Sequence, residues 1–253
     1  GNLGLSSFPW QQTLTSPSLS NVGDLYGASV SASTDGTWLY VSAPNAGNVY
    51  VYQSNATSYY TYANTISVGS SAAAQFGYTI KTTSTGNQVA ISAPYQAVGT
   101  VSSAGVVYVF DRSIETFIAN GTTYHTTYPN SGISKVSVNG VTVTSGFIFT
   151  GTTLTFTTAP TTGSVITVET NYIQLLETLN SPIPTSGGAF GTVTWISGND
   201  ADVYVSSPGY SASGYYSGIV YRYANQGANY GSITGTTYSS VINLGDSIRI
   251  NGI

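Results

Sequence analysis

The side chains best suited to metal chemistry form one short acidic loop. Asn199, Asp200 and Asp202 bring an amide and two carboxylates together within a few residues. Calcium takes about six to eight oxygen ligands, several of them carboxylates, so this loop supplies only part of a site. A hairpin turn held by Asx side chains explains the same residues without an ion. We therefore expect no metal and no cofactor, with these three residues as the only metal candidates.

Arrangements that catalyse reactions are missing from the sequence. His125 is the only histidine, and no Gly-x-Ser-x-Gly elbow accompanies it, so a serine nucleophile with a histidine base is not indicated. Glycosidases need two carboxylates at a set separation, and none of the nine acidic residues forms an obvious pair. Asp111 and Arg112 follow a predicted strand and are typical of a solvated turn. The sequence therefore predicts a protein that is not an enzyme.

The composition narrows the class of fold and of partner. Charged residues make up 6% of the 253 residues, whereas Gly and Tyr are abundant, and this bias favours strands and turns over helices. Five Lys and Arg residues cannot build the basic stripe that binds a phosphate backbone. No apolar run reaches the roughly 18–20 residues of a membrane span. We expect an all-β protein that binds no nucleic acid and has no membrane span.

An internal repeat is the main signal in the sequence. Three short alternating segments, bounded by Gly or Pro, occur together three times, and each group predicts three antiparallel strands. In Val49–Tyr52 one face is Val and the other Tyr, so both faces of the sheet need cover, as in stacked propeller blades. The copies are Tyr26–Val30, Leu39–Pro44 and Gly47–Tyr52, then Phe76–Ile80, Val89–Pro94 and Gly105–Phe110, then Phe190–Thr194, Val203–Pro208 and Gly218–Tyr223.

The aromatic-Gly, Ala-Pro and Gly-x-Val-Tyr-Val series resembles the FG-GAP repeat of integrin α-type β-propellers. The resemblance covers roughly 8–118 and 172–224, and it implies four-stranded blades, commonly seven in a ring. Fourth strands are expected in Tyr59–Val68 and, before the first and third copies, around Trp10–Leu14 and Tyr172–Leu179. We therefore expect a partial β-propeller with three visible four-stranded blades of a larger ring. The absence of Met, including at position 1, also leads us to expect an excerpt or a processed chain.

The region 119–171 interrupts the repeat and reads as an inserted small β module. Asn139-Gly140, the strongest two-residue hairpin signal, separates Lys135–Val138 from Val141–Val143. Further short strands are predicted at Phe147–Thr150, Leu154–Thr157 and Val165–Glu169. The region resembles small β modules of bacteriophage tail-fibre and virion structural proteins. A second insertion is expected in 225–253. Gly235–Tyr238 has the same sequence as Gly121–Tyr124, and Ile250–Ile253 is similar in sequence to Val138–Val141.

Tyrosine offers rigid, amphipathic contact area that suits both protein and sugar partners. Those of the 21 tyrosines that alternate with Val in predicted strands are expected to pack between sheets. Those in predicted loops or outer strands are the candidates for a contact surface: Tyr59, Tyr60, Tyr210, Tyr215 and Tyr216.

The sequence favours a non-catalytic virion structural or tail-fibre-like protein of a bacteriophage, which presents surface for host attachment or assembly. The expected partners are other virion proteins or a host-surface glycan or protein, and the chain could also form a homo-oligomer. The expected location is the virion surface or the extracellular space. A bacterial or algal cell-surface adhesin with the same propeller is the first alternative. A polysaccharide-cleaving tail enzyme is the second.

The repeat hairpins should be stable without metal. FG-GAP repeats commonly carry a calcium loop between strands one and two, but the loops here are 33–37, 83–87 and 198–202, and only the last holds more than one carboxylate. An ion present at a hundred times its Kd would add about 2.7 kcal/mol of stability. We predict the same melting temperature in excess chelator and in millimolar calcium. A clear rise with calcium would contradict this and would make Asn199, Asp200 and Asp202 the first ligands to test.

Overall fold

The computed structural model describes residues 11–18, 23–54, 59–130, 135–197, 202–212, 215–216, 218–225 and 230–231. The expected all-β class is confirmed over these ranges. The strands pair antiparallel, and the helical content is two short 3-10 turns, η1 (Pro44–Ala46) and η2 (Ala72–Ala74). No helix in the described ranges is long and apolar enough to cross a membrane.

The first sheet is a four-stranded meander. Its second, third and fourth strands lie where they were predicted, but the first strand was predicted at Tyr26–Val30 and begins only at Val30, because the chain turns at 26–29. β2 ends where Pro44, which lacks an N–H donor, begins η1. Gly47 then takes φ +65°, which turns the chain into the next strand. The fourth strand expected in Tyr59–Val68 is confirmed. In sheet order the strands are β1 (Val30–Ala32), β2 (Trp38–Ala43), β3 (Asn48–Ser54) and β4 (Tyr60–Ile66).

The second sheet is larger than the sequence predicts. Residues 76–111 were expected to form a four-stranded unit, but they supply three strands, and the fourth, β13, returns only after the insertion. The sheet continues into the insertion because β7 and β13 are long and stay paired. In sheet order the strands are β10 (Val141–Val143), β9 (Lys135–Val138), β13 (Val165–Asn180), β7 (Val106–Ile118), β6 (Gln88–Ala93) and β5 (Ile80–Thr82).

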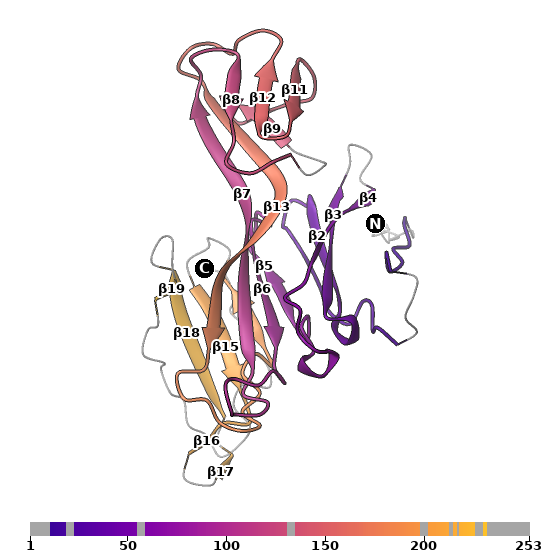
Figure 1. Ribbon diagram of the computed structural model, residues 1–253, viewed down its shortest axis with the longest axis vertical. Helices are drawn as coiled ribbons and strands as arrows, with labels where there is room; N and C mark the ends of the chain where they lie inside the picture. Colours follow the sequence, from indigo (N-terminus) through magenta and orange to yellow (C-terminus); the bar gives the residue numbers. More distant parts are fainter. Residues whose placement is uncertain are drawn as a thin grey trace, which may run out of the picture.

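The outer parts of β7 and β13 carry an arm, residues 113–169, away from the other sheets (Figure 1). A second small sheet in the arm consists of β11 (Phe147–Thr150), β12 (Thr153–Phe156) and β8 (Thr123–His125). The arm has its own apolar cluster, which includes Leu154, Phe156 and Ile166. Asn139 and Gly140 have φ of 51° and 79°, as a tight hairpin turn requires, so the β9–β10 hairpin is confirmed.

The third sheet comes from the last copy of the repeat. A two-stranded hairpin, β16 (Ser211–Ala212) and β17 (Tyr215–Tyr216), lies between its second and third strands in the chain. The second insertion expected in 225–253 falls outside the described residues, apart from Asn225, Tyr230 and Gly231. In sheet order the strands are β14 (Thr194–Ile196), β15 (Asp202–Ser207), β18 (Ile219–Asn225) and β19 (Tyr230–Gly231).

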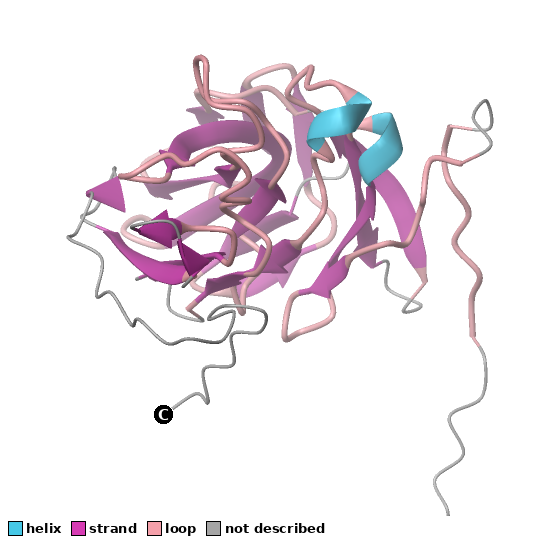
Figure 2. Cartoon of the chain, turned by 90° about the horizontal axis from the view of Figure 1, so that it is seen from below, coloured by secondary structure: helices cyan, strands magenta, loops and turns pink. Residues whose placement is uncertain are grey.

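The three sheets pack face to face (Figure 2). Their first strands, β1, β5 and β14, are neighbours. Tyr40 and Val49 of the first sheet share an apolar cluster with Phe76 of the second repeat. Val107 and Phe190 belong to the corresponding cluster between the second and third sheets. The backbone N–H of Ile80 also donates to Ser29 Oγ, at 3.0 Å, and thereby joins β5 to the first sheet. Each repeat therefore buries one face against the next repeat.

The glycine of each aromatic-Gly pair lets two sheets approach closely. A Cβ built on Gly77 would lie 2.9 Å from Ser42 Cβ, and one built on Gly191 would lie 2.9 Å from Ser92 Cβ. The equivalent Gly27 of the first repeat has no atom of a neighbouring element within 4 Å of such a Cβ. Close approach is thus a requirement at two of the three positions.

Replacing Gly191 by Ala should destabilise the protein more than replacing Gly27 by Ala. Both glycines have positive φ, +97° and +89°, so both variants should lose about 1–2 kcal/mol through backbone strain. Only the methyl group added by Gly191→Ala would also press against Ser92 and Val107, and overpacking of this kind costs typically about 1–3 kcal/mol more. Urea denaturation of the two variants measures the difference. Equal losses would contradict a close contact at Gly191.

Candidate functional site

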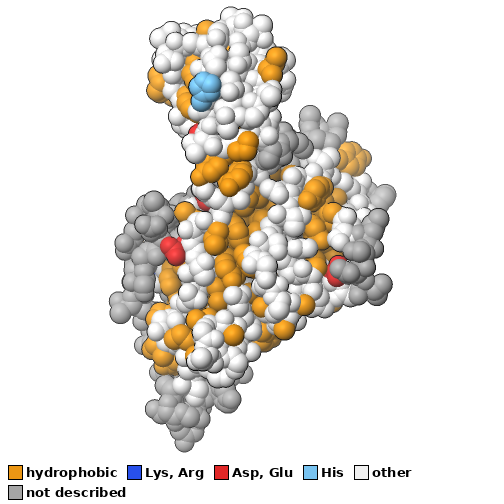
Figure 3. Space-filling model, in the orientation of Figure 1, with side chains coloured by type: hydrophobic (Ala, Val, Ile, Leu, Met, Phe, Trp, Pro, Cys, Tyr) orange, Lys and Arg blue, Asp and Glu red, His pale blue; other side chains and the backbone are white. Residues whose placement is uncertain are grey.

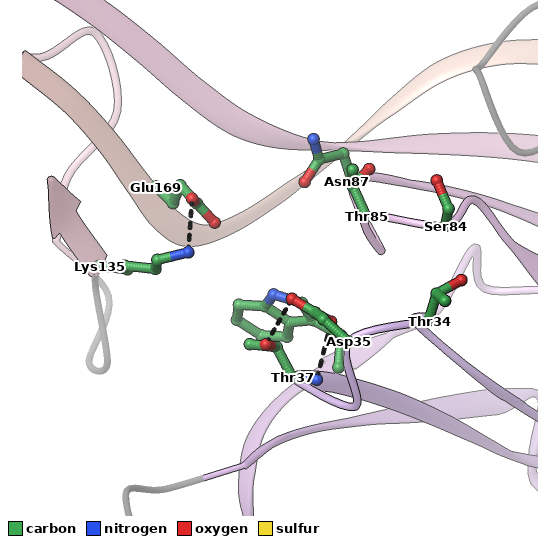
Figure 4. A pocket seen from close by; sticks show the side chains of 9 residues that line it. Thr34, Asp35, Thr37, Ser84, Thr85, Asn87, Lys135 and Glu169 are labelled. Atoms are coloured by element: carbon green, nitrogen blue, oxygen red, sulfur yellow. Dashed lines mark hydrogen bonds and ion pairs between the residues drawn. The ribbon is translucent and has the colours of Figure 1, made fainter. Parts of the chain in front are cut away.

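A pocket of about 350 Å³ lies where the arm meets two hairpins of the sheets. Thr34, Asp35 and Thr37 come from the β1–β2 turn, and Ser84, Thr85 and Asn87 come from the β5–β6 turn. Trp38, Lys135 and Glu169 complete the lining. The labelled side chains in Figure 4 approach the pocket from these different parts of the chain. Three parts of the fold therefore meet at one polar pocket.

The β1–β2 turn is held by Asp35. Its carboxylate accepts hydrogen bonds from Ser33 Oγ at 2.6 Å, Thr37 N at 3.0 Å and Thr37 Oγ1 at 2.7 Å. Burial raises the pKa of Asp35, but these hydrogen bonds outweigh it, so the pKa lies below its ordinary value. Asp35 is therefore ionised at neutral pH and serves as an acceptor, not as a proton donor.

Arg112 is the buried cation beside the pocket. Its guanidinium lies 3.7 Å from the centre of the Trp38 ring, and its Nη2 donates to Asn87 Oδ1 at 2.7 Å. Burial lowers its pKa while Tyr40 and Glu169 raise it, and an arginine remains charged in either case. Its Nε and Nη1 have no acceptor among the described residues, so the stack on Trp38 and the carboxylate must offset most of the cost of burial.

Glu169 joins that buried cation to the arm. Its Oε2 lies 3.3 Å from Arg112 Nη2, and its Oε1 lies 3.3 Å from Lys135 Nζ. The three side chains are 16%, 1% and 36% exposed in the order Glu169, Arg112 and Lys135. Because Lys135 is on β9 and Glu169 on β13, this short network fixes the base of the arm against Trp38 of the first sheet.

Tyr40 ties the same two sheets on the inner side of this network. Its hydroxyl donates to the carbonyl of Gly86 at 2.8 Å, and burial raises its pKa to about 12, so it remains a neutral donor. The backbone N–H of Thr34 also donates to the carbonyl of Ser84 at 2.7 Å, which links the two turns. The pocket is therefore polar, and both of its carboxylates, those of Asp35 and Glu169, are already hydrogen-bonded or ion-paired within the protein. These contacts hold together the parts of the fold that line the pocket.

The metal candidates are only partly described. Asn199 and Asp200 lie outside the described residues. Asp202 begins β15, and its Oδ2 accepts from Arg222 Nε at 2.8 Å and from the Tyr204 hydroxyl at 3.4 Å. No group of three His, Cys, Asp or Glu residues in the described ranges is arranged to hold a metal. His125 is exposed on the arm with Thr153 Oγ1 3.3 Å from its Nδ1.

The tyrosines proposed as a contact surface lie in different places. Tyr59 is 45% exposed, whereas Tyr60 is half-buried and donates from its hydroxyl to the Gly36 carbonyl at 2.8 Å. Tyr210 is also half-buried and packs against the cluster between the second and third sheets. Tyr215 and Tyr216 form β17, and their side chains lie outside the described part of the structure.

Sequence reasoning missed the buried Arg112 beside the pocket and Trp38, which lines it. The interpretation of Asp111 and Arg112 as a solvated turn is wrong for Arg112, which is 2% exposed, because β7 continues to Ile118 instead of ending there. Trp38 was not singled out. The available signal was an arginine, Arg112, at an inward-facing position of an apolar strand. That signal could not identify the partners, because Trp38 and Glu169 lie far from Arg112 in the sequence.

Removing the Arg112 side chain should be far more damaging than removing that of Arg222. Arg112→Ala leaves Glu169 without its buried partner and Trp38 without its stacked cation, and breaking a buried pair costs about 3–5 kcal/mol. Arg222→Ala breaks a pair in which the arginine side chain is 49% exposed, so we expect little change. Urea denaturation of both variants is the measurement. A small effect of Arg112→Ala would show that the joint is not a major source of stability.

No protein-family model matches the chain, and no curated protein sequence matches it.

Proposed function

We propose that the three sheets are consecutive blades of an FG-GAP-type β-propeller and that the chain is a non-catalytic scaffold that presents the arm. The support for the blade assignment is the repeated contact. Gly77 packs on Ser42 and Val49, and Gly191 packs on the equivalent Ser92 with Val107. The adjacent first strands of the three repeats fit the inner strands of such a ring.

The observation that carries the presenting role is the way the arm is attached. β7 and β13 are continuous strands that belong to both the second sheet and the arm. The arm is also fixed at its base by the buried Arg112 and by Glu169. An arm held in this way projects at a set angle, and a rigid element presents contact groups at a low entropic cost.

The surface chemistry suits an exposed assembly. Uncharged polar and apolar side chains cover most of the face in Figure 3, with scattered acidic side chains and the histidine on the arm. With five Lys and Arg residues in the chain, this surface is poorly suited to nucleic acid. Together with the resemblance of the insertion to tail-fibre modules, these features support a bacteriophage virion surface protein whose partners are virion proteins or host-surface glycans and proteins.

A variant without the arm tests this proposal. Ile118 and Val165 are directly opposite each other in the β7–β13 pair, so an Asn-Gly turn can replace residues 119–164 without changing the register. The labelled intact chain and this variant are tested against intact bacterial cells and their purified surface polysaccharides. We expect the intact chain to bind a subset of cells and the arm-less variant to lose that binding while unfolding in one cooperative transition.

Two further results would overturn parts of the proposal. New reducing ends in a polysaccharide incubated with the intact chain would show an enzyme. Equal binding by the intact and arm-less chains would show that the arm is not the presented element. Gold-labelled antibody against the chain locates it in a culture of its source: label on virus particles supports the virion assignment, and label on cell surfaces supports a cellular adhesin instead.

A further inference from the structure

The pocket at the base of the arm holds opposite charges that do not pair with each other. Lys135 and Glu169 reach it from the arm, and Asp35 reaches it from the β1–β2 turn (Figure 4). Burial raises the pKa of Asp35, whereas the hydrogen bonds of its turn and, in smaller part, the charge of Lys135 lower it. The ion pair that Lys135 forms is nevertheless with Glu169, at 3.3 Å. A cation and an anion held apart in this way leave room for a polar molecule that contacts both.

The two carboxylates of the pocket keep acceptor positions that the described residues do not use. A carboxylate has about four such positions. Asp35 accepts from Ser33 Oγ and from the N–H and hydroxyl of Thr37, so about one position is left. Glu169 pairs once with Arg112 and once with Lys135, so about two are left. Lys135 has further N–H groups besides the one directed at Glu169. The pocket therefore offers acceptors and donors to a ligand at the same time.

The charges around the pocket cancel, and the rest of its lining is uncharged. Asp35 and Glu169 are matched by Lys135 and by the adjacent Arg112, so a ligand with a net charge has no excess of opposite charge to meet. Trp38 supplies an apolar surface. The remaining lining residues have hydroxyl or amide side chains: Thr34, Thr37, Ser84, Thr85 and Asn87.

This lining suits a neutral molecule that has many hydroxyl groups and an apolar C–H face, which is the chemistry of a sugar ring. The pocket volume of about 350 Å³ lies within the range of roughly 300–1,000 Å³ that is typical of small-molecule sites.

The face of the arm that continues from the pocket is exposed. Side chains alternate along a strand, so Thr167 and Val165 lie on the same face of β13 as Glu169. Val165 is 41% exposed, and Ile118, directly opposite it on β7, is 60% exposed. A sugar chain with one unit in the pocket can therefore continue along this face.

We propose that the pocket binds one neutral sugar unit of a longer glycan. Asp35 and Glu169 accept hydrogen bonds from its hydroxyl groups, and Lys135 donates to its oxygens. The source of the glycan rests on the proposed function, in which host-surface glycans are partners of the chain. The binding itself follows from the side chains that line the pocket.

A titration of the full chain with free sugars, followed by nitrogen–proton correlation spectra, tests the site directly. The probes are glucose, galactose, mannose, N-acetylglucosamine and N-acetylgalactosamine, each at millimolar concentration. We expect at least one of them to bind and to shift the backbone amide signals of Thr34, Thr37 and Lys135. A panel in which no sugar binds, or binding that shifts signals elsewhere and leaves these three unchanged, would overturn the proposal.

Two variants change the pocket and keep the buried pair of Arg112 and Glu169. Lys135→Gln removes a charged donor, and Thr85→Trp fills the pocket from an exposed turn. Each should weaken sugar binding by about tenfold or more, because hydrogen bonds to charged groups are among the stronger ones and a filled pocket excludes the ring. Thr100→Trp is the matched control, because Thr100 is exposed in the turn between Val98 and Val101.

The control should bind sugar like the wild type, and all three variants should keep the wild-type circular dichroism and unfolding transition. Wild-type affinity in either pocket variant, or equal weakening in the control, would overturn the proposal. Should a pocket variant fail to fold, the amide shifts of the wild-type chain decide the question without it.

The same point variants separate this proposal from the proposed function. The arm-less variant lacks Lys135 together with the arm, whereas Lys135→Gln and Thr85→Trp keep the whole arm. If the intact chain and both pocket variants bind cells and surface polysaccharide equally well, the proposed function stands and the pocket is not the glycan site. If free sugars bind in the pocket but the intact chain binds no cell and no polysaccharide, the sugar site stands and the proposed function fails.

Discussion

The constraint on which the rest of this structure depends is that each repeat makes a sheet with two apolar faces. In β2, Tyr40 belongs to the cluster between the first and second sheets, and the adjacent Val41 belongs to a cluster on the opposite face. A sheet of this kind cannot be stable alone in water, because both of its apolar faces would be exposed. Stacking of successive repeats is therefore required, and glycines at the points of closest approach make it possible.

The arm departs from this rule, and Arg112 makes the departure possible. Where β7 leaves the three packed sheets and enters the arm, the register between β7 and β13 shifts, so that residues 170–172 face the single residue Ser113. Arg112 lies beside this irregularity. Its side chain does not pack against a further sheet but stacks on Trp38 and forms an ion pair with Glu169. A buried cation with defined partners has a strong orientational requirement, so it fixes the direction of the arm in a way that a purely apolar contact would not.

Local chemistry made parts of the fold predictable from the sequence. The β9–β10 hairpin was predicted with its bounds because Asn139-Gly140 determines turn and register within a few residues. The length of β7 was not predictable in the same way, because Arg112 is buried by Trp38 of another sheet. Tyr60 shows the same limit for contact residues: its position suggested an exposed ring, but its hydroxyl binds Gly36 in a distant turn. The propeller ring remains a prediction, since it concerns the arrangement of whole sheets.

The third sheet shows how the scarce charges of this chain give direction to a repeated contact. Arg222 stands where the other two repeats have Val51 and Val109, and both valines are fully buried. Its partner Asp202 already compensates the charge within the same sheet, so a covering sheet would meet a neutral pair instead of a lone cation. Such a pair adds little affinity, but it disfavours partners that cannot accommodate it.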